Sequence, residues 1–277
     1  MKKLTRETLV TKGQDHFIDK GITAVMACAV VIGIVYVLAQ TDRGFLYIVS
    51  NGLPPFLAFA AFATATAGLV HNGVNMKNRV SSVWIGYSLG VLFWFLGEFT
   101  WAVYALWYST PIPYPSLADG FWLAGYVPLL CAIVVQSWPF HEFLTSRKML
   151  PVILAVFVLA VLLLVVLIPA TYSSAIGQDF VTVVISLAYP LLDVALLVFA
   201  LPVLFLFGKG TFWRPFLWVT VGLILTFLGD ILFSWATLNG TYYDGSYLEL
   251  LFHWSYLALA YGFYLRFKSG TGAKMLG

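Results

Sequence analysis

The chain has 277 residues, of which 61% are hydrophobic and 10% are charged, and its mean hydropathy is +0.91. So few charges cannot cover the surface of a soluble domain, which excludes an ordinary globular protein. The formal net charge of +3 comes from basic residues dispersed in small groups beside apolar segments, which excludes a basic patch for nucleic acid. We therefore expect an all-α, polytopic membrane protein with the lipid bilayer, and no nucleic acid, as a partner.

In chain order, residues 1–20 are polar and basic and are expected to form a cytoplasmic tail or a short interfacial helix. The first apolar run, Ile22 to Ala39, is long enough to cross the roughly 30 Å hydrocarbon core as a helix. Seven further apolar runs follow: Pro54 to Val70, Val83 to Tyr108, Phe121 to Trp138, Leu150 to Ile168, Phe180 to Phe207, Phe216 to Leu238, and Tyr247 to Phe267. The sequence thus predicts eight transmembrane helices.

The basic residues indicate an orientation, because Lys and Arg collect on the cytoplasmic side of membrane proteins. Fourteen of the fifteen basic residues lie before the first predicted helix, after an even-numbered helix, or at the end of the chain. Only Arg43 lies on the opposite side. This pattern predicts a multi-pass protein of the cell (plasma) membrane with cytoplasmic N and C termini.

Two parts of the chain share a pattern of acids and aromatic residues. A Leu-Gly-Glu motif at Glu98 returns 132 residues later as a Leu-Gly-Asp motif at Asp230. Two further pairs are each offset by 130 residues: Asp119 with Glu249, and Tyr126 with Tyr256. Self-similarity at a fixed offset indicates an internal duplication.

Each half would hold an even number of spans, so the two four-helix repeats are expected to run parallel. The predicted organisation is a cytoplasmic tail at 1–20, a first repeat at 21–144, a cytoplasmic linker at 145–149, a second repeat at 150–268 and a cytoplasmic tail at 269–277.

Acidic side chains are costly inside a membrane, so those within apolar runs indicate a functional site. Five of them fall in the outer half of the predicted spans or near the midplane, where no Lys or Arg lies. Residues four or seven apart share a helix face, which brings His253 and several aromatic residues beside these acids. We expect an outward-facing ligand-binding pocket of Glu98, Asp119, Asp193, Asp230, Glu249, His253, Trp101, Trp122, Tyr126 and Tyr256.

Two other interpretations of the acids stay open. Asp119 and Glu249 stand at the starts of predicted helices and could be N-terminal caps, and the deeper acids could make neutral hydrogen bonds between helices. A carboxyl deep in the bundle without a basic partner is costly to ionise. We therefore expect at least one of Glu98 and Asp230 to be neutral at pH 7. Alternatively, Glu249 and His253, four residues apart, could bind a metal ion with a further acid. The sequence identifies no cofactor.

The motifs around Pro115-Ser116-Leu117-Ala118-Asp119, Tyr189-Pro190-Leu191-Leu192-Asp193 and Gly229-Asp230 resemble those of the multi-span sensor regions that precede diguanylate cyclase, phosphodiesterase and histidine kinase domains in prokaryotes. The resemblance covers nearly the whole chain and implies a sensory or ligand-binding module. The output domain of those proteins does not follow here, so signalling through a partner protein or a homo-oligomer is expected.

A fainter similarity, through Gly229-Asp230 and His253, is to lysoplasmalogenase-type membrane hydrolases. It implies a lipid hydrolase that uses carboxylates and a histidine. A third possibility is cation-coupled transport, since deep acids can relay protons. No nucleophile elbow, phosphate loop or dinucleotide fingerprint is found in the sequence, which favours a non-enzymatic function.

Overall fold

The computed structural model describes residues 4–274 except 73, 76, 109–111, 139–141, 143–145, 148, 207–212 and 239. The long helices are α1 Leu4–Ala39, α2 Arg43–Asn72, α3 Arg79–Ala102, α4 Leu117–Ser137, α6 Leu150–Ala175, α7 Phe180–Leu206, α8 Trp213–Leu238 and α9 Leu250–Lys274. A π-helical segment, Val103–Tyr108, extends α3, and a 3-10 turn, Tyr247–Glu249, precedes α9. The described part of the chain contains no strand, so the all-α prediction is confirmed.

Each predicted apolar run coincides with a helix, but α1 and α2 begin much earlier than predicted, and α3, α4 and α8 begin about one turn earlier. Helix α1 begins at Leu4 and so includes most of the predicted tail. Helix α2 begins at Arg43, because Pro54 and Pro55 lie inside the helix and do not start it. Parts of the predicted tails and linker (1–3, 145, 148 and 275–277) lie outside the described residues, as does Phe207 at the end of the predicted sixth span.

Seven helices of the described chain are long and apolar enough to cross a membrane, namely α1, α2, α3, α4, α6, α7 and α8. Helix α9 is long, but its composition is more polar. It packs against α1, α2 and α8 and buries much of its surface, including His253 and Ser255. A helix inside a bundle contacts other helices more than lipid and can therefore carry polar residues. The eighth span stays a prediction.

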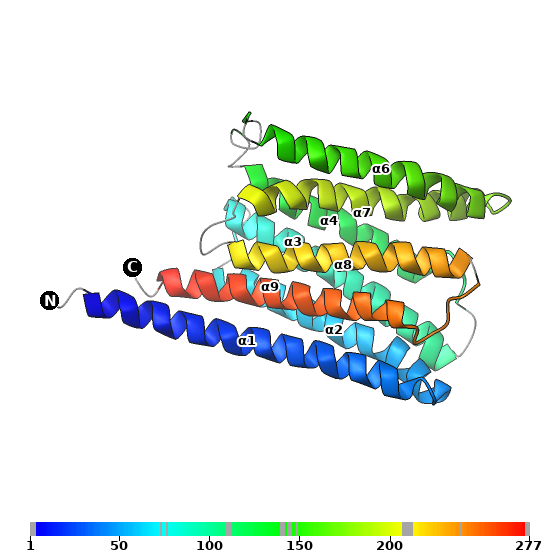
Figure 1. Cartoon of the computed structure of the whole chain (residues 1–277), viewed down its shortest axis with the longest axis horizontal. Coiled ribbons are helices and arrows are strands. Elements are labelled where there is room, and N and C mark those ends of the chain that lie inside the picture. Colours follow the sequence, from blue (N-terminus) through cyan, green and yellow to red (C-terminus); the bar gives the residue numbers. More distant parts are fainter. Residues whose placement is uncertain are drawn as a thin grey trace.

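Six of the helices form a closed ring in the order α2, α3, α4, α7, α8, α9, each in contact with the next and α9 with α2. Helix α1 lies outside this ring against α9 and α2, and α6 lies outside it against α7. Helix α1 begins, and α9 ends, at one end of the bundle, which we call the terminal end (Figure 1). The opposite end, with the α1–α2, α6–α7 and α8–α9 connections, is the distal end.

An apolar core fills the ring toward the terminal end. It includes Trp84, Val91, Leu129, Leu259 and Phe263, each at most 3% exposed. Trp84, near the start of α3, and Phe263, in the second half of α9, lie in the parts of these helices nearest the terminal end (Figure 1), and Val91 and Leu259 lie near the middle of the same helices. The distal half of the ring is packed differently, and it holds a cavity.

The pairs α3–α4 and α8–α9 pack in the same register. A Cβ atom at Gly90 would collide with Leu129, and a Cβ atom at Gly222 would collide with Leu259. These contacts keep the offsets of the sequence motifs, since Gly222 follows Gly90 by 132 residues and Leu259 follows Leu129 by 130. A second pair of close approaches has the same offsets, with Gly97 against Trp122 and Gly229 against Phe252. Glycine therefore lets both helix pairs approach closely at equivalent positions.

Candidate functional site

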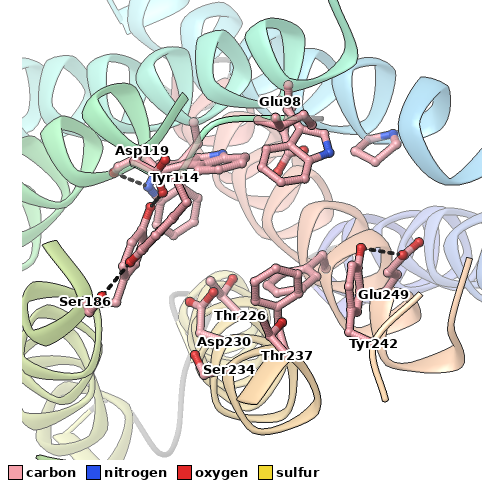
Figure 2. A pocket seen from close by; sticks show the side chains of 18 of the residues that line it. Glu98, Tyr114, Asp119, Ser186, Thr226, Asp230, Ser234, Thr237, Tyr242 and Glu249 are labelled. Carbon is pink, nitrogen blue, oxygen red and sulfur yellow. Dashed lines mark hydrogen bonds between the residues drawn. The ribbon is translucent and has the colours of Figure 1, made fainter. Parts of the chain in front are cut away.

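A cavity of about 690 Å³ lies inside the distal half of the helix ring. Its wall includes residues from α2, α3, α4, α6, α7, α8 and α9 and from the connections at the distal end. Figure 2 shows Glu98 and Asp119 on one side of this space and Thr226, Asp230 and Ser234 on the other. The volume is within the usual range for pockets that hold small organic molecules.

The structure brings together the residues that the sequence analysis selected, with one exception. The predicted residues in the wall are Glu98, Asp119, Asp230, Glu249, His253, Trp101, Trp122, Tyr126 and Tyr256. Asp193 lies behind the wall, where it is 3% exposed and accepts a hydrogen bond of 2.6 Å from the Tyr126 hydroxyl. It is thus connected to the cavity through Tyr126.

The wall of the cavity is acidic. Four carboxyl groups line it, and among the described residues that line it there is no Lys or Arg. Arg43, which stands at the distal end, has its guanidinium 4.4 Å from the centre of the Tyr243 ring and is not in the wall. The cavity is therefore suited to a positively charged or neutral occupant and would repel an anion.

Glu249 accepts four hydrogen bonds, which connect four parts of the chain. The hydroxyls of Tyr36 in α1 and Ser50 in α2 donate to Oε2 at 3.0 and 2.7 Å. The Tyr242 hydroxyl and the Gly245 amide, both in the α8–α9 connection, donate to Oε1 at 2.9 and 2.8 Å. Every strong acceptor position of this carboxylate is used, so Glu249 holds the distal end of α1 and α2 against α9.

Two tyrosines of the distal connections, Tyr242 and Tyr114, keep their protons. Burial, and then the negative charge of Glu249, raise the pKa of Tyr242 above its ordinary value. Burial also raises the pKa of Tyr114, although a 2.8 Å hydrogen bond with Ser186 acts in the opposite direction. Both phenols are therefore neutral at physiological pH, and Tyr242 serves Glu249 as a donor.

Asp119 is part of the capping box at the start of α4, in which Ser116 is the N-cap residue and Asp119 lies three residues later. Its Oδ2 accepts the backbone amide of Ser116 at 2.7 Å and the Ser116 hydroxyl at 2.8 Å. Its Oδ1 accepts the hydroxyl of Tyr189, in α7, at 2.9 Å. The side chain therefore provides a hydrogen-bond acceptor for the backbone amide at the start of α4 and connects α4 to α7.

Glu98 and Asp230 have fewer partners, and a tyrosine from the opposite half of the chain contacts each of them. Glu98 is also hydrogen-bonded by the Trp122 side chain of α4. The Tyr256 hydroxyl of α9 donates to Glu98 Oε1 in α3 at 2.7 Å. The Tyr126 hydroxyl of α4 lies 3.4 Å from Asp230 Oδ2 in α8. The carboxyl groups of Asp193 and Asp230 also hydrogen-bond each other, which requires a proton on one of them.

His253 is 1% exposed, and both of its ring nitrogens have neighbours. Nδ1 lies 2.6 Å from the carbonyl oxygen of Glu249, so this nitrogen carries the proton, because a carbonyl can only accept. Nε2 lies 3.3 Å from the Tyr36 hydroxyl. In the described part of the protein, no group of three or more His, Cys, Asp or Glu side chains is placed to hold a metal ion.

Sequence reasoning missed several polar residues of the site. Ser50 was missed because the expected loop before Pro54 is helical, and Tyr36 because it lies in an apolar run. Thr226 and Ser234, which line the cavity, stand four residues before and after Asp230. This i, i+4, i+8 spacing is visible in the sequence and could have identified both.

No protein-family model, curated protein or solved structure matches this chain.

Proposed function

We propose that this protein is a multi-pass protein of the cell membrane and acts as a sensor or accessory module that binds a small organic ligand in its acidic and aromatic cavity. The cavity itself carries the proposal. It has the volume of a ligand pocket, contains polar groups from most helices of the ring, and lies within a bundle whose helices are able to span a membrane.

The orientation in this proposal places the cavity toward the outside. Most of the basic residues belong to the N- and C-terminal segments or lie at the helix connections of the terminal end, and the cavity lies toward the distal end. With basic residues on the cytoplasmic side, both termini are cytoplasmic and all eight helices cross the membrane. A ligand would then enter from outside the cell.

The proposal includes two parallel four-helix repeats. The shared packing register of α3–α4 and α8–α9 supports a duplication. The crossed contacts support it too, because Tyr256 of the second half meets Glu98 of the first, and Tyr126 of the first half meets Asp230 of the second. A ligand between Glu98 and Asp230 would thus contact equivalent positions of both repeats, and we propose that a ligand-dependent movement of the repeats is passed to a partner protein.

The arrangement supports binding better than lipid hydrolysis. A hydrolase of the kind considered above would use Asp230 and His253 on one reacting atom. The His253 ring is instead engaged by the Glu249 carbonyl and the Tyr36 hydroxyl, on the α1 side of α9. This environment suits a histidine that positions α1 and Glu249.

A fluorescent dye tests whether the cavity accepts ligands. We would measure binding of neutral 1-aminoanthracene to the protein in phosphatidylcholine nanodiscs, with empty nanodiscs as background. Saturable binding is expected for the wild type. It should be lost in Ser234→Trp, which fills the cavity, and kept in Leu232→Trp, since Leu232 is 43% exposed and is not among the residues that line the cavity. Equal dye binding by the two variants, or none by the wild type, would contradict the proposed function.

A further inference from the structure

The acids of the cavity differ in how many donors they already have. Glu249 accepts four hydrogen bonds and Asp119 accepts three. Glu98 has two hydrogen-bond partners, the Tyr256 hydroxyl at 2.7 Å and the Trp122 side chain, and Asp230 has two, the Tyr126 hydroxyl at 3.4 Å and the Asp193 carboxyl. A buried carboxylate requires compensation by donors or by a positive charge. Glu98 and Asp230 are thus the acids with acceptor capacity left for a ligand.

Aromatic rings surround these two acids. Trp94, Trp101 and Trp122 all line the cavity, and the ring centres of Trp101 and Trp122 are 5.7 Å apart. Tyr126 and Tyr256, which contact Asp230 and Glu98, also line it. Carboxylates combined with aromatic faces are the surroundings that an organic ammonium ion prefers. A cavity of about 690 Å³ is far larger than an inorganic ion and leaves room for the organic part of such a ligand.

Asp193 and Asp230 form a carboxyl pair that holds a proton. Their side chains are hydrogen-bonded to each other, and the Tyr126 hydroxyl contacts both. Two adjoining carboxylates cannot both be charged in a low-dielectric interior without a cation. The titratable groups facing the pair are Tyr126 from α4, Tyr189 from α7, Glu98 from α3 and Tyr256 from α9. All of these are acids or phenols, so none supplies a positive charge.

We propose that the cavity binds an organic ammonium ion between Glu98 and Asp230, and that binding releases the proton shared by Asp193 and Asp230. The ammonium charge replaces the proton as the group that neutralises the carboxyl pair, and the proton leaves through the cavity to the outside water. One positive charge enters and one leaves, so the charge within the membrane stays constant. This inference rests on the proposed function, because it names the ligand class of the same cavity.

The test uses benzyltrimethylammonium, whose charge is permanent, so that any proton released comes from the protein. Isothermal titration calorimetry in nanodiscs, in two buffers of different ionisation enthalpy, gives both the affinity and the number of protons released. For the wild type we expect about one proton per bound cation and an affinity that rises about tenfold per pH unit while the pair is protonated. The uncharged carbon isostere neopentylbenzene should bind at least about tenfold more weakly.

The variants separate the two parts of the inference. Glu98→Gln should weaken cation binding at least about tenfold, because it removes a charge that contacts the ligand. Asp193→Asn should still bind the cation but release no proton, since the Asp230 carboxyl then faces a neutral amide and no longer shares a proton. Asp42→Asn is the matched control, because it removes an exposed carboxylate at the same end of the bundle and keeps a side-chain oxygen for the Phe45 amide. It should behave as the wild type does.

Three outcomes would overturn the inference while leaving the proposed function intact, provided that 1-aminoanthracene still binds. They are no displacement of the dye by benzyltrimethylammonium, equal affinity for the cation and its carbon isostere, and cation binding without proton release. If the dye does not bind to the wild type either, the proposed function itself fails.

Discussion

At the scale of single residues, Glu249 illustrates how a charge can be buried for a structural purpose. Its two carboxylate oxygens together accept four hydrogen bonds, from Tyr36, Ser50, Tyr242 and Gly245. Hydrogen bonds to a charged acceptor are stronger than neutral ones and compensate for its burial. Glu249 is therefore part of the framework of the cavity, whereas Glu98 and Asp230 face the open space with acceptor capacity to spare.

Tyr242→Phe should destabilise the protein by about 1 kcal/mol at neutral pH, because one hydrogen bond to Glu249 is lost. The raised pKa of Tyr242 gives this difference a pH dependence. Below about pH 10, the usual pKa of tyrosine, both folded and unfolded states hold the phenol proton and the difference is constant. As the pH rises further, the unfolded state ionises first and the wild type loses its advantage.

Denaturant unfolding of the wild type and Tyr242→Phe from pH 7 to about pH 11 would check this. Tyr243→Phe is a control, since its hydroxyl contacts Gln40 at 3.2 Å and leaves Glu249 untouched. A stability difference that grows above pH 10 would contradict the assignment of Tyr242 as a neutral donor.

At the scale of helices, the apolar runs predicted the helices well, because about twenty consecutive apolar residues have few other stable states in a membrane. The predicted start of α2 was wrong. Proline is common at the first position of a helix, but Pro54 and Pro55 lie within a long helix here. The site residues Glu98 and Asp230 could be predicted because an acid within an apolar run is costly and therefore informative. Their tyrosine partners could not be assigned, because the contacts depend on how distant helices dock.

The equivalent glycines of the two helix pairs lead to a prediction. Gly90→Ala and Gly222→Ala should each destabilise the protein by about 1 to 3 kcal/mol, since the added methyl group would collide with Leu129 or Leu259. Gly120→Ala is the matched control, because its helical position has no atom within 4 Å of the added methyl group. It should be neutral or slightly stabilising.

Thermal unfolding of the three variants in nanodiscs would measure these effects. A clear loss of stability in only one of Gly90→Ala and Gly222→Ala would argue against equivalent packing of α3–α4 and α8–α9.

At the scale of the whole molecule, the apolar core and the cavity occupy opposite ends of one helix ring. The terminal half is closed by packed side chains, and the distal half keeps polar groups around an open space. This division is what a binding module open to one side of a membrane requires. In the proposed orientation, with the basic residues in the cytoplasm, the closed core would prevent leakage and the cavity would open to the outside.

Labelling of a cysteine in the cavity tests this central claim most directly. In a variant with Cys28→Ser and Cys131→Ser, which removes the two exposed free thiols, Ser234→Cys would be treated in intact cells with a membrane-impermeant methanethiosulfonate that carries a trimethylammonium group. Leu232→Cys, on the outer surface of α8, is the control and should stay unlabelled, because a thiol in lipid does not ionise.

We predict that Ser234→Cys is labelled from outside, faster by the cationic reagent than by its sulfonate analogue, because the cavity wall is acidic. Labelling only after the cells are permeabilised, or faster labelling by the anionic reagent, would contradict an outward-facing acidic cavity.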